Sequence, residues 1–104
     1  MFGVVMMSEL KILKDHPDRA IAILQRTIRA EVLRMQQGKV AIEQKLKQFE
    51  EKYQVSSNDF IASWTAENLD GKDMEYVEWV GEYRCLENIK QDLQILVSLQ
   101  NVSI

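Results

Sequence analysis

The feature that most constrains this fold is a run of apolar residues, spaced three and four apart, between Ile21 and Tyr53. Side chains at this spacing lie on one face of an α-helix, whereas a half-buried strand needs apolar residues at alternate positions. The run therefore predicts one long amphipathic helix over residues 17–53, with the spacing of a coiled coil. Its apolar members are Ile21, Leu24, Ile28, Val32, Met35, Ile42, Leu46, Phe49 and Tyr53.

The limits and the continuity of this helix depend on a few residues. Pro17 suits a first helical turn and disfavours helix before it, so we expect the helix to begin there with Asp15 as its N-cap. Leu33 and Val40 widen the apolar stripe, which is more typical of a bundle core than of a two-stranded seam. Gly38 costs about 1 kcal/mol relative to alanine inside a helix. We expect a single helix, with a kink or a break at Gly38 as the alternative.

Two further helices are predicted after this one. Residues 55–59 form a polar boundary in which serine and asparagine favour helix caps, and a short helix follows over residues 57–67. Asp70 and Gly71 indicate a turn, after which Asp73 is expected to cap a second long helix over residues 73–99. Acidic residues in the first two turns of that helix suit its dipole. Its apolar residues are Met74, Tyr76, Val77, Trp79, Val80, Tyr83, Leu86, Ile89, Leu93, Leu96 and Val97.

Together these elements predict an all-α fold. We expect an antiparallel helical hairpin of two long amphipathic helices with a short connecting helix, similar to a coiled coil or bundle. The small number of prolines (one) and glycines (four) in 104 residues agrees with long helices. Residues 1–104 are treated as a single helical domain whose N-terminal segment, residues 1–16, is poorly defined. Within it, residues 8–14 can form two helical turns, and residues 1–6 are either an upstream start extension or a short strand.

The formal net charge of −3 conceals a division along the chain. Residues 1–54 hold ten Lys and Arg against seven Asp and Glu, a balance of +3, and residues 55–104 hold three against nine, a balance of −6. The acidic half can receive a basic partner, or it can be ordinary solvated surface. A basic edge on the long helix has no interleaved aromatic residues, so nucleic-acid binding is not expected. This edge consists of Arg19, Arg26, Arg29 and Arg34.

Few residues in the sequence are suited to chemistry. His16 is the only histidine, and no cysteine stands at a metal-ligand spacing from it. Glutamates recur in pairs, but without the Glu-x-x-His pattern of di-iron helical bundles, and we interpret them as solvated helix faces. We therefore expect no catalytic residue, no cofactor site and no metal site. The lone Cys85 favours a reducing compartment, so a cytoplasmic location is expected, and the apolar N-terminal run is too short to span a membrane.

Aromatic residues gather around the predicted closure of the hairpin. We expect them to form a small hydrophobic core, and some of them to form a contact surface as well, because Trp and Tyr are enriched at interface hot spots. Together with two interleaved glutamates they make up our candidate set of partner-contacting residues. The set is Phe60, Trp64, Tyr76, Glu78, Trp79, Glu82 and Tyr83.

Three segments carry a resemblance to known proteins: Phe-Glu-Glu-Lys-Tyr-Gln-Val-Ser-Ser-Asn-Asp-Phe at 49–60, Glu-Asn-Leu-Asp at 67–70 and Glu-Tyr-Val-Glu-Trp at 75–79. They resemble a group of small prokaryotic helical proteins, several of which are similar to antitoxins encoded beside small ribonuclease-like toxins. The shared pattern is a long helix ending in Glu-Lys-Tyr-Gly, a Ser-Ser-x-x-Phe helix start, an acidic turn and an aromatic Glu-Trp helix. The chain departs from it at Gln54, where the pattern has glycine. Residues 1–25, where antitoxins carry a DNA-binding element, have no counterpart, so DNA-binding autoregulation is not expected.

The charge division and the resemblance together predict a non-enzymatic protein-interaction module. We expect an antitoxin-like subunit that neutralises a small basic toxin partner and forms a homodimer through its long helix. The alternative is a structural helical homo-oligomer or an adaptor for another partner. A third interpretation, an enzyme or a metal carrier without a recognisable motif, predicts bound metal in the purified protein. No membrane association is expected.

Overall fold

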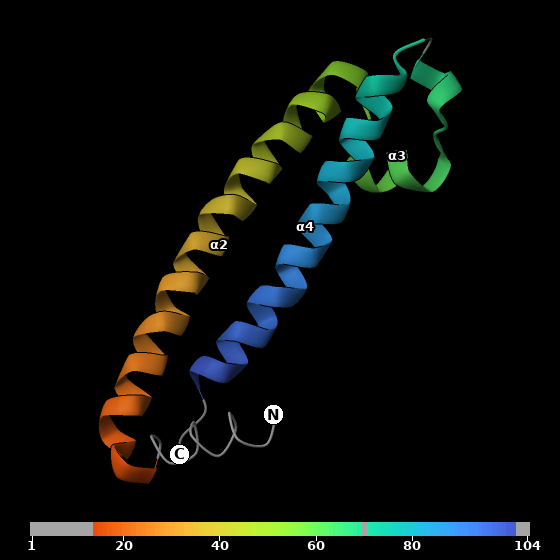
Figure 1. Ribbon diagram of the computed structural model, residues 1–104. Coiled ribbons are helices and arrows are strands. Elements are labelled where there is room, and N and C mark those ends of the chain that lie inside the picture. The colour runs from red at the N-terminus through yellow and green to blue at the C-terminus, as the bar shows by residue number, and fades with distance from the viewer. Residues whose placement is uncertain (1–13, 70, 102–104) are drawn as a thin grey trace.

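The computed structural model describes residues 14–69 and 71–101, so the expectations for residues 1–13 lie outside its scope. The described residues form helices and contain no strand. In chain order the elements are α2 (Pro17–Tyr53), α3 (Ser57–Ser63), the 3-10 helix η1 (Ala66–Leu69) and α4 (Asp73–Gln100). The long helices α2 and α4 run antiparallel and pack along each other, while α3 and η1 connect them at one end (Figure 1). The predicted all-α helical hairpin is confirmed. We call the end that holds α3 and η1 the closed end, and the opposite end the open end.

Helix α2 is a single uninterrupted helix, and the alternative of a break at Gly38 is wrong. Its N-cap is His16 rather than the expected Asp15, and no side chain caps it. Pro17 accounts for this start, because proline occupies the first turn without needing a partner for an N–H. A Cβ atom added at Gly38 would lie 3.7 Å from Ile89 Cδ1 of α4, so Gly38 lies on the packed face of α2. Packing against α4 supports the helix through this weak position.

At the closed end, α2 ends at Tyr53, and Gln54 is its C-cap. Gln54 adopts left-handed backbone angles, φ 53° and ψ 44°, and its N–H donates to the Glu50 carbonyl. Its side chain also donates to the Glu51 carbonyl at 2.7 Å. The chain therefore ends the helix in the geometry that glycine favours, at the conformational cost of a side chain in the left-handed region.

The short helix α3 has two caps and ends earlier than predicted. The Ser56 hydroxyl accepts the Asp59 N–H at 3.1 Å, and the Glu50 carboxylate accepts the Ser57 N–H at 2.7 Å. The helix ends at Ser63, short of the predicted residue 67, because Trp64 takes an extended backbone conformation.

The expected loop after residue 67 is partly helical, since residues 66–69 form η1. Asn68 accepts hydrogen bonds from both the N–H and the hydroxyl of Thr65, which holds this turn in place. Helix α4 then begins at Asp73. Its N-cap is Lys72 and not Asp73, and Gly71, at φ 83°, makes the turn where it was predicted. Asp73 instead lies in the first turn, where its charge suits the helix dipole.

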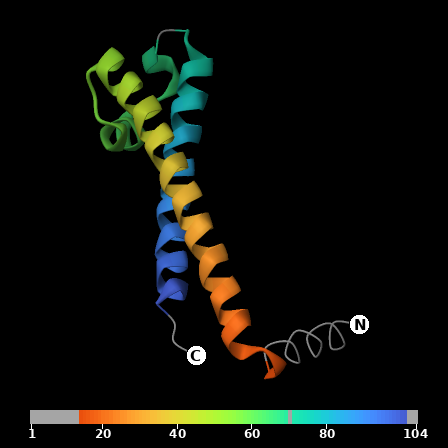
Figure 2. The ribbon, with the colours of Figure 1, turned by 90° about the vertical axis from the view of Figure 1, so that its left-hand side faces the viewer.

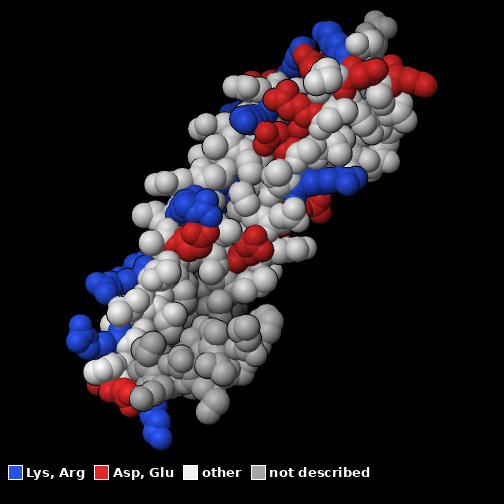
Figure 3. All heavy atoms as spheres, viewed as in Figure 1, with Lys and Arg blue, Asp and Glu red and all other residues white. Residues whose placement is uncertain are grey.

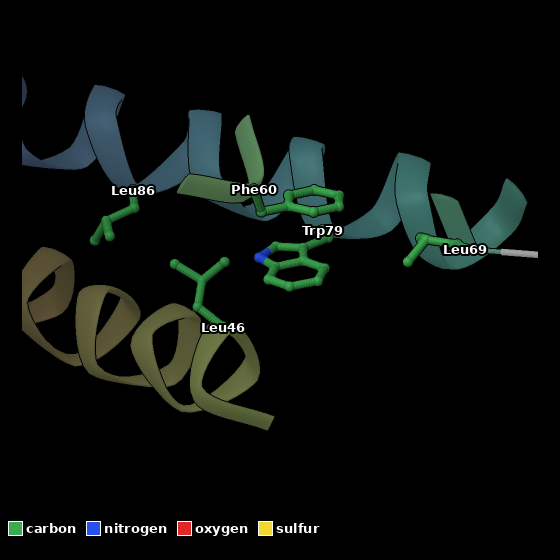
Figure 4. Close-up of a cluster of buried hydrophobic side chains, with 5 residues drawn as sticks. All are labelled: Leu46, Phe60, Leu69, Trp79 and Leu86. Atoms are coloured by element: carbon green, nitrogen blue, oxygen red, sulfur yellow. The ribbon is translucent and has the colours of Figure 1, made fainter. Parts of the chain in front are cut away.

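The hydrophobic core lies at the closed end of the hairpin (Figure 4). Its buried members come from all four elements, so closing the hairpin requires α3 and η1 as well as the long helices. They are Leu46, Phe60, Leu69, Trp79 and Leu86. Toward the open end Val32 is buried, but Leu24 is 46% exposed although it belongs to the predicted stripe. The last turn of α4 ends before the start of α2, which therefore protrudes at the open end (Figures 1 and 2).

Candidate interaction surface

Trp79 is the centre of the closed end. Its ring stacks on Phe60 at a centroid separation of 3.7 Å and lies 5.3 Å from Phe49 and 5.7 Å from Tyr53. Its indole N–H donates to the Ser57 hydroxyl at 2.9 Å, which satisfies the polar atom of a side chain that has no exposed surface. Trp79 thus attaches α4 to α3 through one stacked pair and one buried hydrogen bond.

This packing corrects the candidate set of partner-contacting residues. Phe60 and Trp79 are fully buried within the chain and offer no side-chain surface to a partner. Both were also expected to belong to a core, and both lie in it. Their burial follows from position, since each faces the other across the α3–α4 junction (Figure 4).

The other three aromatic candidates lie at the edge of this core and stay half-exposed. Trp64 packs against Phe60 and against Tyr53, at centroid separations of 5.8 and 6.2 Å. Tyr76 packs edge-on against Phe60, and the Tyr83 hydroxyl donates to the Asn58 side chain at 2.6 Å. These rings therefore combine a structural role with a remaining accessible edge.

The candidate glutamates differ in their surroundings. Glu78 is exposed, whereas Glu82 is half-exposed and lies 3.3 Å from the Lys45 ammonium of α2. A third carboxylate, Glu75, was not in the candidate set. It accepts a hydrogen bond from Lys52 at 2.6 Å and another from the Tyr53 hydroxyl.

These hydrogen bonds change the acidity of both side chains. The Lys52 ammonium, followed by the Tyr53 hydroxyl, lowers the pKa of the Glu75 carboxyl. The Glu75 carboxylate in turn raises the pKa of Tyr53. Glu75 is thus an ionised side chain that joins the start of α4 to the end of α2.

Two apolar residues of α4 point away from the hairpin. Met74 is 81% exposed and Val77 is 63% exposed, although the sequence places both among the apolar residues of the last helix. Val77 lies two residues before the buried Trp79, and two helical steps of about 100° bring a side chain to the opposite face. Gly81 follows on this outer face, and a Cβ atom there would meet nothing within 4 Å. We call Met74, Val77, Glu78 and Gly81 the outer α4 patch.

The outer α4 patch belongs to the acidic end of the molecule. Described residues between 42 and 87 include ten Asp and Glu against five Lys and Arg. In the rest of the described chain, residues 14–41 and 88–101, the balance reverses to four acidic residues against seven basic ones. One face of the molecule shows red carboxylates gathered toward the closed end and blue side chains along the open part of α2 (Figure 3). The molecule thus has an acidic closed end and a basic open end. This division cuts across the two halves of the sequence, because α2 and α4 run antiparallel and each extends along the hairpin.

Groups suited to chemistry do not converge within residues 14–69 and 71–101. No group of three or more His, Cys, Asp or Glu is placed there to hold a metal ion. Cys85 is exposed on α4, and His16 is exposed as the N-cap of α2. A groove between α2, α3 and α4 holds charged residues of both signs, among them Lys47 and Glu87. One of its carboxylates has a structural role, since Glu50 caps α3.

Comparisons of the chain with protein-family models, with curated proteins and with solved structures find no match. Among the helices of the described chain, none combines the length and the apolar character needed to cross a membrane. The interpretation of the surface therefore depends on its own residues.

Proposed function

We propose that the chain is a non-enzymatic interaction subunit, similar to an antitoxin, whose closed end covers a small basic toxin protein. The observation that carries this proposal is the outer α4 patch. Met74 and Val77 are the two most exposed large apolar side chains in the described chain, and the hairpin makes little use of them. They stand within the acidic end of the molecule, next to the exposed Glu78.

The two parts of this surface supply different contributions to binding. Exposed apolar side chains provide the anchors that a partner can bury, since a few central residues carry most of the energy of an interface. Carboxylates around them favour a basic partner and speed its approach, because complementary charge acts mainly on association rate and specificity. Gly81 keeps the outer face of α4 flat, so a partner backbone can come close to the helix.

Coexpression with the product of the adjacent reading frame tests the proposal. We expect that product to inhibit growth when expressed alone, and this chain to restore growth and to copurify with it. A harmless neighbour that does not copurify would contradict the proposal.

Matched substitutions locate the surface. Changing Met74 and Val77 together to serine should abolish growth rescue and copurification, because the anchors are lost. Changing Ile95 and Leu99 to serine is the control, since these residues are 59% and 49% exposed on α4 toward the open end. The control variant should still rescue growth. If both variants lose growth rescue equally, either the contact lies elsewhere or both variants are unstable. Circular dichroism distinguishes these cases, because an unstable variant loses its helical signal.

A structural homo-oligomer is the second candidate function, favoured by exposed apolar residues along α2. Leu33 and Val40 are 57% and 53% exposed although they belong to the widened apolar stripe. An unrelated gene neighbourhood together with a stable free oligomer would favour this candidate over the first.

A further inference from the structure

The outer face of α4 continues beyond the outer α4 patch as a line of exposed residues that follows most of the helix. Its members succeed one another in steps of four, three, four, four, three and four residues, the spacing of a helix face that packs lengthwise against another helix. This face lies opposite the core, since Asn88 follows the buried Trp79 by nine residues and nine helical steps of about 100° reach the opposite side. We call the line the outer α4 seam; it consists of Val77, Gly81, Arg84, Asn88, Asp92, Ile95 and Leu99, all exposed.

The spacing of the seam is symmetric about Asn88. Three seam residues precede it and three follow it, at distances of four, seven and eleven residues on each side. The pair at four residues is Arg84 and Asp92, which carry opposite charges, and neither has an ion-pair partner within residues 14–69 and 71–101. If a second α4 lies antiparallel on the first with a two-fold axis at Asn88, Arg84 of each subunit faces Asp92 of the other.

The remaining seam positions also match in this register. Gly81 faces Ile95, so the smallest residue of the seam receives one of the largest. Val77 faces Leu99, which joins two apolar side chains that are 63% and 49% exposed in the single chain. Asn88 faces its own copy, and a polar residue at one seam position fixes the register of paired helices. The seam is therefore complementary to itself, as the interface of a two-fold symmetric dimer must be.

The charge along α4 favours the antiparallel orientation. Residues 73–87 hold five Asp and Glu against one Arg, whereas residues 88–100 hold one Asp against one Lys. A parallel pair would place the two acidic halves side by side, and like charges oppose association. The antiparallel pair instead places each acidic half beside the half that has no net charge.

We propose that a second copy of the chain docks antiparallel on the outer α4 seam, α4 against α4, and forms a two-fold symmetric dimer with its axis at Asn88. The contact lies on α4, whereas the sequence alone predicts homodimerisation through residues 17–53. The dimer does not depend on the antitoxin-like function. It covers Val77 and Gly81 of the outer α4 patch, so a second copy and a basic partner compete for these two residues.

The mass of the full-length protein in solution, without any partner, is the first test. Light scattering should give about 24 kDa, twice the chain mass of 12.1 kDa. A monomeric wild-type protein would overturn the dimer. It would leave the proposed function untouched, because growth rescue by the chain does not require a second copy.

Charge reversal within the seam is the second test. Arg84→Asp and Asp92→Arg should each weaken the dimer by about 10-fold or more, because each change occurs on both subunits and brings two pairs of like charges together. Combining the two changes should restore the wild-type dimer, since opposite charges again face each other. Circular dichroism should show unchanged helix content, because both side chains are exposed in the hairpin.

The matched control for charge reversal is Arg26→Asp, at an exposed position of α2, which should leave the dimer unchanged. Single seam variants that dimerise as strongly as wild type would overturn the proposal. So would a combined variant that dimerises no better than either single variant.

The orientation of the two subunits is the third test. Spin labels on Ser98→Cys, in a Cys85→Ser background, should be separated by about 30 Å in pulsed electron paramagnetic resonance, since each lies 10 residues from the axis at about 1.5 Å per residue. A parallel dimer would instead place the labels about 10 Å apart, and this result would overturn the proposal.

Discussion

Replacing Ser57 with alanine tests the buried hydrogen bond that attaches α3 to the hairpin. The Ser57 hydroxyl accepts the Trp79 indole N–H at 2.9 Å. Ser57 is 4% exposed and Trp79 is 0% exposed, so water cannot take over as acceptor unless the core opens. The substitution removes one oxygen atom and leaves the stacked rings in place. Its main effect is therefore an indole N–H that is buried without a partner.

Leaving a buried donor unsatisfied costs about 1–3 kcal/mol, whereas an ordinary hydrogen bond contributes about 0.5–1.5 kcal/mol net. We expect the free energy of unfolding of Ser57→Ala to fall by about 2 kcal/mol, a large share of the total for a domain this small. The thermal midpoint should fall by about 8–16 °C, from the usual 4–8 °C per kcal/mol in domains of this size.

Urea denaturation followed by circular dichroism measures this loss, at one protein concentration for all variants so that any association contributes equally. The matched control is Ser63→Ala in the same helix, where the exposed hydroxyl donates only to the Asp59 carbonyl. We expect the control to change stability by less than about 0.5 kcal/mol, the usual range at surface positions. A Ser57→Ala variant as stable as this control would refute the role assigned to the bond.

Three further predictions concern the surface of the hairpin. Gly81→Ala should stabilise the protein by about 0.5–1 kcal/mol in urea denaturation, because the site is open and alanine favours helix. A destabilised variant would mean that the site is not open. Gln54→Gly should stabilise the protein by about 1 kcal/mol, because glycine removes the steric strain of a side chain in the left-handed conformation at the end of α2. No gain in stability would indicate that the side-chain hydrogen bond of Gln54 offsets this strain. Because Lys52 and Tyr53 lower the pKa of Glu75 in the folded state, its contribution is complete above the ordinary carboxyl value of 4.5 and is lost as the pH falls through the lower folded value. A pH series of denaturation curves should therefore fall less steeply below pH 4.5 in Glu75→Gln than in wild type; equal slopes would contradict this linkage.

Much of the fold follows from patterns that act over short distances. The three-and-four spacing from Ile21 to Tyr53 predicts a helix because packing rewards any arrangement that buries such a stripe. The Asp70-Gly71 pair locates the turn because glycine reaches a left-handed conformation at little cost. Neither feature needs knowledge of the partner helix, and both long helices lie where these patterns place them.

Other features depend on contacts that the pattern does not specify. The α3 helix ends at Ser63 because Trp64 turns to pack on Tyr53, a residue of another helix. Most residues in the first two turns of α4 are apolar or aromatic. Hydrophobicity alone therefore does not distinguish the buried Trp79 from the exposed Val77. Their separation of two residues would have been the usable signal, since helical periodicity puts such a pair on opposite faces.

The measurement that tests the proposed function most directly is hydrogen–deuterium exchange of this chain, alone and with the product of the adjacent reading frame. We predict that the partner slows amide exchange over residues 74–85, which include the outer α4 patch, and leaves residues 23–40 of α2 unchanged. Unaltered exchange along the whole chain, or slower exchange confined to α2, would contradict the proposal that the closed end is the partner-binding surface.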